Sequence, residues 1–204
     1  MIKNILLFIT IFHFFSTPLW AQNADHHKVD RVIASALEQT KQTLYYDPSY
    51  RRLVYPRGDV PLDRGVCTDV LIRAFRKAGV DLQVLVHEDM TQAFDAYPKR
   101  RGSNRPDPNI DHRRVLNLMK YFERKGKALR LTGELTHFSP GDIVAWRLHN
   151  GSPHIGIISN VQRPKKDRYL VVHNIGFGTK LEDILFQYKM IGHYRFFKNQ
   201  SDNV

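Results

Sequence analysis

The first half of the chain carries apolar residues at helical spacing in three segments. Residues Asp25–Leu44 repeat an apolar side chain every three or four positions, which predicts a helix with one buried face. A second helix is predicted to begin close to Cys67 and to end at Gly79, and a third to run from about His112 to Lys125. The predicted inward positions are Val29, Val32, Ile33, Ala36, Leu37 and Leu44; Val70, Leu71, Ala74, Phe75 and Ala78; and Val115, Leu118, Met119 and Phe122.

The second half of the chain has the pattern of strands. Asp142–Leu148, His154–Val161 and Tyr169–Asn174 are short apolar runs bounded by Pro, Gly and Asn, and His193–Phe197 fits a last strand. The segment Leu181–Tyr188 is ambiguous between an extended form and one or two helical turns. Helices first and strands later predict an α+β fold, in which N-terminal helices pack on an antiparallel sheet.

The N-terminus has the three parts of a secretory signal peptide. Lys3 precedes an apolar run from Ile5 to Phe15, and the small residue Ala21 stands before the polar Gln22. The apolar run is shorter than the roughly 20 residues that a membrane span needs. The pattern therefore indicates export and cleavage.

The expected mature protein is residues 22–204, a single domain, after removal of the signal peptide at residues 1–21. We expect it in the periplasm or outside the cell, with no stable membrane span after cleavage. Leu19 is not the small residue preferred three positions before a cleavage site, so an uncleaved anchor is the alternative.

The chain is strongly basic, with 31 Lys and Arg against 20 Asp and Glu and a formal net charge of +11. Outside the cytoplasm the expected anionic partners are peptidoglycan, other cell-wall polymers and membrane surfaces, and not nucleic acid. A basic solvated surface without a specific partner explains the charge equally well. The sequence leaves the oligomeric state open.

The one cysteine, Cys67, has no partner for an intramolecular disulfide. It stands where a helix is predicted to begin, and the partial positive charge of a helix N-terminus favours a thiolate. This position is typical of a nucleophile, for which we expect a pKa below the ordinary cysteine value. A small buried cysteine is the structural alternative.

A nucleophilic thiol also needs a base, which is normally a histidine oriented by a third polar group. Among ten histidines, His154 begins a predicted strand and His173 stands near the end of the next. In antiparallel neighbours these two positions lie side by side, so we expect the two imidazoles to meet. We also expect a ring nitrogen of His154 within about 4–5 Å of the Cys67 sulfur, as a thiolate–imidazolium pair.

Four segments in this order resemble the NlpC-type cell-wall peptidases: GVCTDVLIRAFRKAGV, SPGDIVAWRL, SPHIGIISN and YLVVHNIG. These are papain-like cysteine hydrolases related to the CHAP amidases. More narrowly, the chain resembles a secreted bacterial group labelled a domain of unknown function, from about Tyr45 to Phe197. The resemblance implies a papain-like fold with Cys67 as nucleophile, His154 as base and His173 as the residue that orients the base.

The same resemblance suggests two residues on the substrate side. Tyr55 lies 12 residues before Cys67, where the family often has a tyrosine near the oxyanion site. The family usually has an Asp before a Cys-Ser pair, whereas this chain has Cys67-Thr68 followed by Asp69. Tyr55 and Asp69 are therefore the candidates for oxyanion or substrate contacts, and this departure makes the nucleophile better supported than the substrate.

Two further polar clusters are candidates for a metal or substrate site. Residues 87–89 are His, Glu and Asp, but adjacent side chains point in different directions, and no HExxH or paired-cysteine pattern occurs. No metal and no organic cofactor is therefore expected. Asp111 in the Asp111–Arg114 cluster fits a helix cap, or the cluster lines the substrate cleft.

These features predict a secreted cysteine hydrolase, an amidase or endopeptidase acting on amide bonds of peptidoglycan. One alternative keeps the same triad but directs it at another acyl bond, in an ester or a lipid. The other is a basic cell-wall-binding module in which the triad has decayed.

The export signal makes a direct prediction about the mature protein. We expect the exported chain to begin at Gln22, because the small residue Ala21 ends the signal pattern. N-terminal sequencing of protein from the periplasm or medium measures this. Intact Met1 on protein in a soluble cytosolic fraction would contradict it.

Overall fold

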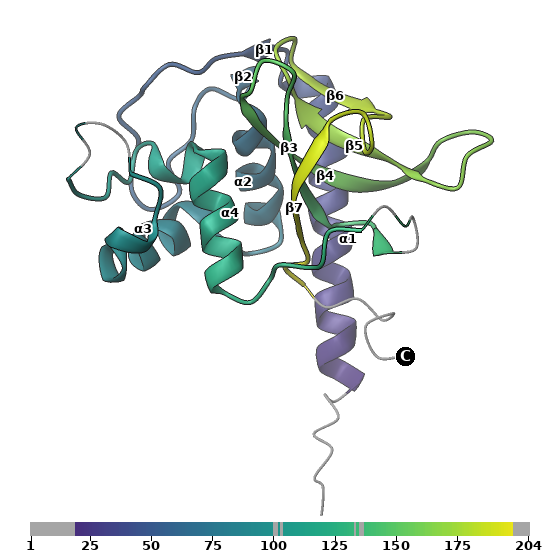
Figure 1. Ribbon diagram of the computed structural model, residues 1–204, viewed down its shortest axis with the longest axis horizontal. Helices are drawn as coiled ribbons and strands as arrows, with labels where there is room; N and C mark the ends of the chain where they lie inside the picture. Colours follow the sequence, from purple (N-terminus) through teal and green to yellow (C-terminus); the bar gives the residue numbers. More distant parts are fainter. Residues whose placement is uncertain (1–18, 100–101, 103, 133, 135–136, 198–204) are drawn as a thin grey trace, which may run out of the picture.

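The computed structural model describes residues 19–99, 102, 104–132, 134 and 137–197 (Figure 1). Most of the predicted signal peptide lies outside these residues. Helix α1 begins at Leu19, so the predicted cleavage point after Ala21 falls in its first turn. Within the described residues, every helix is too short or too polar to cross a membrane.

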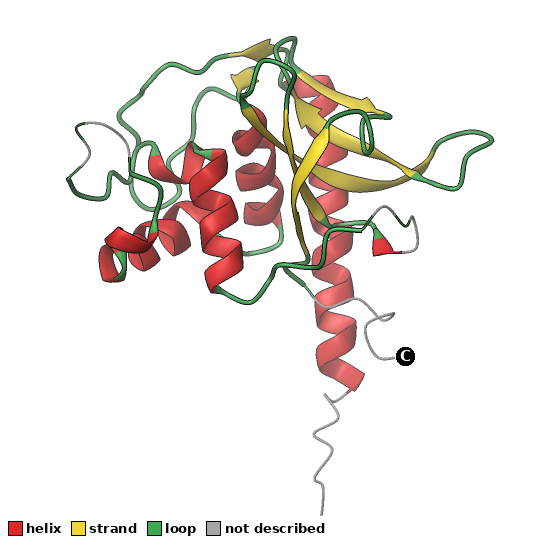
Figure 2. Ribbon diagram, viewed as in Figure 1, coloured by secondary structure: helices red, strands yellow, loops and turns green. Residues whose placement is uncertain are grey.

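The helices come first in the chain and the main sheet later, as the sequence pattern predicts and the colours of Figure 1 show. Figure 2 distinguishes the helices, in red, from the strands, in yellow. The α-helices are α1 (Leu19–Gln42), α2 (Cys67–Lys77), α3 (Leu82–Gln92) and α4 (Val115–Arg124), with short 3₁₀ turns η1 (Phe94–Ala96) and η2 (Asp111–Arg113). The strands are β1 (Tyr45–Tyr46), β2 (Arg64–Gly65), β3 (Ile143–Arg147), β4 (Pro153–Gln162), β5 (Tyr169–Asn174), β6 (Thr179–Glu182) and β7 (Lys189–Tyr194).

Five strands form one antiparallel sheet in the order β6-β5-β4-β3-β7. The predicted strands over residues 142–148, 154–161 and 169–174 are all present, within one residue or so of their expected ends. Strands β1 and β2 form a separate short parallel pair that directly precedes Cys67. The α+β architecture, with Cys67 at a helix start beside an antiparallel sheet, is thus confirmed.

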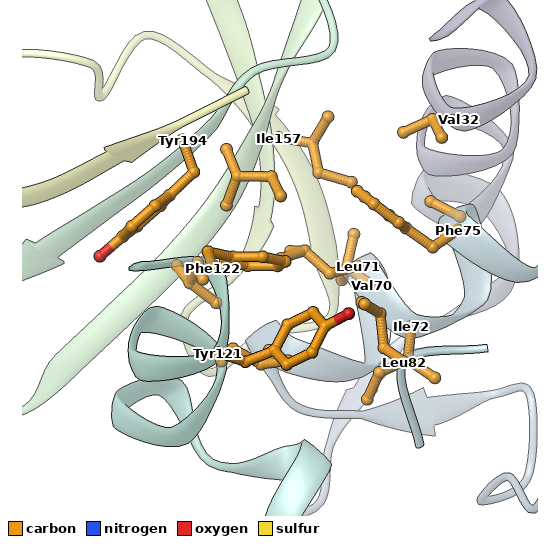
Figure 3. Packing of buried hydrophobic residues seen from close by; sticks show 14 of the residues in the cluster. Val32, Val70, Leu71, Ile72, Phe75, Leu82, Tyr121, Phe122, Ile157 and Tyr194 are labelled. Carbon is orange, nitrogen blue, oxygen red and sulfur yellow. The ribbon is translucent and has the colours of Figure 1, made fainter. Parts of the chain in front are cut away.

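The main core lies between the helices and one face of the sheet (Figure 3). Leu71, Phe75 and Phe122 are fully buried there, facing Ile157 of β4. Ring contacts tighten this layer: Phe122 lies 5.3 Å from Tyr194 of β7, between ring centroids. The apolar stripes of the three predicted helices therefore bury as expected, because each stripe spans the same face at 3.6-residue spacing.

A second, smaller apolar cluster covers the opposite face of the sheet. Its members are Phe138, Val144, Trp146, Ile158, Val171, Ile184 and Leu185. The Nε1–H of Trp146 donates to the Leu185 carbonyl at 3.0 Å, which fastens the turn after β6 over this face. Because both faces are covered, the middle strands are apolar at successive positions instead of alternating.

The structure corrects several expected boundaries. Helix α1 ends at Gln42, so Leu44, expected inside, is 55% exposed. The last strand is Lys189–Tyr194 and not His193–Phe197. Phe197 lies beyond the strand, and its ring stacks on that of Phe75 with centroids 5.7 Å apart. Burying this aromatic pair in the core stabilises the protein more than extending the strand would. The ambiguous segment Leu181–Tyr188 contains the end of β6 and then a turn.

Helix α3 was not expected from the sequence. Its apolar residues do not repeat cleanly, since the polar side chains of Gln83 and Asp89 are also buried. The helix begins at an Asp81 cap, whose carboxylate accepts the Gln83 N–H at 3.1 Å. A helix that buries polar as well as apolar residues shows no single apolar stripe, which is the signal the prediction relied on.

Buried polar contacts fix the loop that leads to Cys67. Arg73 of α2 is 6% exposed and pairs with Asp59 through two bonds of 2.9 and 3.1 Å. The same guanidinium donates to Thr43 Oγ1 and to the carbonyl of Arg64. The end of α1, the loop before β2 and helix α2 therefore meet at one buried cation.

Candidate functional site

Helix α2 starts at Cys67, and its first turn is closed by Asp69. The carboxylate of Asp69 accepts the N–H of Val66, the residue before the helix, at 2.7 Å. This reach back from the third helical residue is half of a capping box. A Cβ on Gly65 would lie 3.0 Å from Asp69 Oδ2, so glycine leaves room for this cap. The local sequence GVCTD therefore places the thiol of Cys67 at the helix N-terminus.

A buried ion pair holds the same carboxylate from the other side. Arg113 Nε and Nη2 donate to the two oxygens of Asp69 at 2.8 and 2.9 Å, and both side chains are almost fully buried. Arg113 also donates to the carbonyls of Asp47 and Ser49, and Thr68 Oγ1 donates to the Arg113 carbonyl. Asp69, a candidate for substrate or oxyanion contact, thus has both oxygens engaged in the framework beneath Cys67.

Asn174, at the end of β5, joins the strand that carries His173 to the segment before Cys67. Its Nδ2 donates to the Gly65 carbonyl at 3.0 Å, and the side chain is completely buried. Asn174 was not among the residues predicted for the site, although it directly follows His173. The signal that could have identified it is the apolar strand YLVV, which ends in the two polar residues His173 and Asn174.

His154 and His173 lie in contact, as their places at opposite ends of antiparallel strands predict. His154 Nε2 and His173 Nδ1 are 3.1 Å apart, at hydrogen-bond distance, with the rings nearly perpendicular. Gly156 permits the approach, since a Cβ there would lie 3.1 Å from the Cβ of His173. The His154 ring also lies against Trp146 with centroids 5.9 Å apart, which restrains its rotation.

Cys67 and the histidine pair approach the sheet from different sides. The sulfur of Cys67 meets the backbone N–H of Ile155, the residue after His154. Ile155 packs among the helices, whereas His154, its neighbour in the strand, lies on the face of Trp146. The thiol and the imidazole therefore belong to the same rim of the sheet, where β4 begins. The expected separation of about 4–5 Å between Sγ and a ring nitrogen stays a prediction.

Burial decides the protonation of both groups. Burial raises the pKa of Cys67 to about 12. The backbone N–H groups of Ile155, Thr68 and Cys67 itself favour the thiolate and lower the pKa, but their effect is smaller than that of burial. Burial and the neighbouring His173 lower the pKa of His154 to about 3. The expectation of a lowered Cys67 pKa and a protonated His154 is therefore wrong for the free protein, because burial keeps both the thiol and the imidazole neutral.

Two tyrosines that precede Cys67 in the sequence, Tyr55 and Tyr46, have different surroundings in the structure. Tyr55, the oxyanion candidate, packs edge-on against His87 of α3 at 5.2 Å. Burial, then Glu88 and Asp81, raise its pKa, with no contribution from Cys67. The pKa of Tyr46 in β1, by contrast, is raised by burial, then by Cys67 and Asp69. Tyr46 is also the register partner of Gly65, two residues before Cys67, which its position 21 residues before Cys67 did not suggest.

Comparison with known proteins places the chain in a family. Residues 33–196 match the family model described as "Domain of unknown function (DUF1287)". The chain belongs to this family. It is 51% identical over 166 residues to "Uncharacterized protein YijF" of Escherichia coli strain K12, covering 81% of this chain and 80% of that protein.

Two solved structures resemble the DUF1287 chain in fold. One is NlpC1 from Trichomonas vaginalis, with a TM-score of 0.42 and 12% identity over 88% of this chain and 46% of that one. The other is a lipoprotein-like NLP/P60 family protein from Staphylococcus aureus, with a TM-score of 0.42 and 13% identity over 85% and 42%. This chain spans less than half the length of either.

The acidic members of the two polar clusters, Asp89 and Asp111, make structural contacts. Asp89 is buried and pairs with Arg124 and Lys125, while the neighbouring Glu88 is exposed. Asp111 does not cap α4, since its carboxylate takes the Asp107 N–H at 2.6 Å. Across the described part of the chain, no three His, Cys, Asp or Glu side chains gather as metal ligands do.

Buried neutral histidine makes stability depend on pH. Because the folded pKa of His154 lies near 3 and that of an unfolded histidine near 6.5, its contribution is present above pH 6.5 and is lost as pH falls toward 3. We expect wild type to lose roughly 2–3 kcal/mol more than His154→Gln between pH 7 and 4.5. Chemical denaturation at both pH values measures this, and equal losses would contradict a buried neutral His154.

The raised pKa of Cys67 predicts slow alkylation at neutral pH. The rate with iodoacetamide should climb through pH 9 without levelling, whereas a cysteine in the denatured protein levels off above its ordinary pKa of about 8.5. Below pH 8 the folded protein should react more slowly than the denatured control. A plateau at neutral pH would show that the folded thiol is already ionised.

Proposed function

We propose that this protein is an exported cysteine hydrolase that cleaves amide bonds of peptidoglycan. The observation that carries the proposal is the 3.1 Å contact between His154 Nε2 and His173 Nδ1. His154 lies near the start of β4, and the N–H of the following residue, Ile155, contacts the Cys67 sulfur. A thiol at a helix start, a histidine and a second residue orienting that histidine are the parts that thiol acyl transfer needs.

The proposed reaction starts from the neutral pair. Cys67 attacks the amide carbonyl carbon while His154 takes the thiol proton, so no net charge enters the buried site. The oxyanion develops beside the backbone N–H of Cys67, with Tyr46 as a second donor in preference to Tyr55. His154 then gives its proton to the leaving amine, and a water, activated by the same imidazole, releases the acyl group and restores the thiol.

A basic hollow near the site supports an anionic polymer as the substrate. A cavity of about 630 Å³ is bordered by Arg52, Arg105 and Arg114. Tyr50 Oη donates to Asp107 at 3.1 Å, which ties its two walls together. Arg114 directly follows Arg113, whose ion pair with Asp69 supports the start of α2 at Cys67, so the hollow adjoins this ion pair. Guanidinium groups bind carboxylates and phosphates, which wall polymers carry.

Digestion of purified peptidoglycan tests the reaction. We expect the mature protein to release fragments with new amine and carboxyl ends, identified by mass spectrometry. Cys67→Ala should abolish release, and His154→Ala should slow it by about 10²–10⁴-fold because general-base catalysis is lost. His27→Ala, an exposed histidine on α1, is the control and should retain full activity.

The two alternatives give different outcomes in the same assay. Thiol-dependent cleavage of p-nitrophenyl acetate without any release from peptidoglycan would favour an esterase that uses the same triad. Co-sedimentation with peptidoglycan at equal strength for wild type and Cys67→Ala, without cleavage, would favour the binding module. Either result would overturn the proposed amidase activity.

A further inference from the structure

We propose that Glu182 is a positioning residue that sets the protons of the histidine pair. This inference rests on the proposed function for its catalytic consequence, although the proton positions can be measured without it. Glu182 Oε2 lies 3.0 Å from His173 Nε2, the ring nitrogen that faces away from His154. The three side chains therefore form a chain of contacts from the surface of the sheet to its rim.

The antiparallel pairing of β5 and β6 brings Glu182 to this place. Glu182 is the register partner of Val171, two residues before His173, so the two side chains project from the same face of the sheet. His173 is completely buried, whereas the Glu182 side chain is 48% exposed. A charged carboxylate thus remains hydrated on one side while it contacts a buried ring on the other.

The buried Nε2 of His173 requires such a partner. Among the described residues, no aligned hydrogen bond satisfies this atom, and the Glu182 oxygen lies at ion-pair distance but off the ring N–H direction. Burial lowers the pKa of His173, while Glu182 opposes that shift by stabilising the proton on the ring.

The carboxylate dictates which nitrogens carry protons. A neutral imidazole has one N–H and one acceptor nitrogen. A carboxylate accepts only, so it favours the proton of His173 on Nε2, which leaves His173 Nδ1 as an acceptor. At a separation of 3.1 Å, His154 must then donate from its own Nε2. The remaining nitrogen of His154, Nδ1, keeps its lone pair, and in the proposed reaction it is the atom that takes the proton of the Cys67 thiol.

The opposite arrangement is inactive. If His173 carried its proton on Nδ1, it would donate to His154 Nε2, and His154 would be protonated on Nδ1. His154 would then present an N–H, and not a base, to the thiol. Both arrangements make the same His–His bond, so that bond alone cannot select between them. Glu182 supplies the asymmetry, and it also stabilises the imidazolium that forms when His154 accepts the thiol proton.

Nitrogen NMR of the histidine side chains tests the proton positions in the resting protein. With ¹⁵N-labelled histidine at pH 7.5, wild type should show protonated Nε2 and unprotonated Nδ1 on both His154 and His173. Glu182→Ala should shift both rings toward the opposite tautomers. Glu182→Gln, which keeps an acceptor oxygen, should preserve most of the wild-type pattern. Unchanged nitrogen shifts in Glu182→Ala would overturn the proposal.

Peptidoglycan digestion links the tautomers to the reaction. We expect Glu182→Ala to lower kcat by about 10–100-fold, part of what a general base contributes, with KM little changed and partial rescue in Glu182→Gln. Glu123→Gln is the matched control, since it removes the same charge from a 41% exposed side chain on α4. Thermal unfolding of all variants verifies the fold.

The two proposals fail separately. If wild type does not hydrolyse peptidoglycan but Glu182→Ala changes the tautomers, the amidase function fails and the role of Glu182 stands. If wild type hydrolyses peptidoglycan and Glu182→Ala matches it in both rate and nitrogen shifts, the amidase function stands and the role of Glu182 fails.

Discussion

The buried ion pair between Asp69 and Arg113 is the interaction on which the geometry around Cys67 depends. The two residues are 44 positions apart, and neither is more than 6% exposed. Asp69 closes the first turn of α2, and Arg113 ties that turn to η2 and to the carbonyls after β1. Loss of either partner would strand a charge in the interior at a cost of about 3–5 kcal/mol, so the pair holds three segments in one arrangement.

Burial at this rim outweighs the field of the helix. A helix N-terminus stabilises an anion by typically 0.3–1 kcal/mol, whereas full burial of an ionisable group shifts its pKa by up to about 3–5 units, several kcal/mol. The larger effect prevails, which keeps the Cys67 thiol and the His154 imidazole neutral. In the proposed reaction, the thiol and the imidazole would therefore ionise together, by proton transfer from Cys67 to His154.

The sheet supplies the histidine pair and Glu182, whereas the start of α2 supplies only the thiol. Antiparallel pairing places the start of β4 beside the end of β5, which brings His154 into contact with His173. The next strand, β6, adds Glu182 on the other side of His173. Asn174 then fastens the end of β5 to the carbonyl of Gly65, just before the thiol. The start of α2 is thus joined to η2 and the segment after β1 by the ion pair, and to the end of β5 by Asn174.

Much of this arrangement was accessible from the sequence alone. Apolar periodicity predicted three helices and the central strands, because burial on one face leaves a repeat of 3.6 or a short apolar run. The places of Cys67, His154 and His173 at element ends predicted the contact of the two histidines, since antiparallel pairing is a local rule. Helix α3 and the last strand were missed or misplaced, because their boundaries depend on buried polar groups and on ring packing.

Only the tertiary structure decided the charges and the partners of the site. The pKa directions of Cys67 and His154 depend on how much water the fold excludes, which no motif encodes. Asp69 pairs with Arg113, His173 lies against Glu182, and Tyr46 interacts with Cys67. The distance along the chain between two such residues does not reveal whether they meet in the fold. Local spacing determined which residues could face each other along an element, whereas packing between elements determined which of them meet.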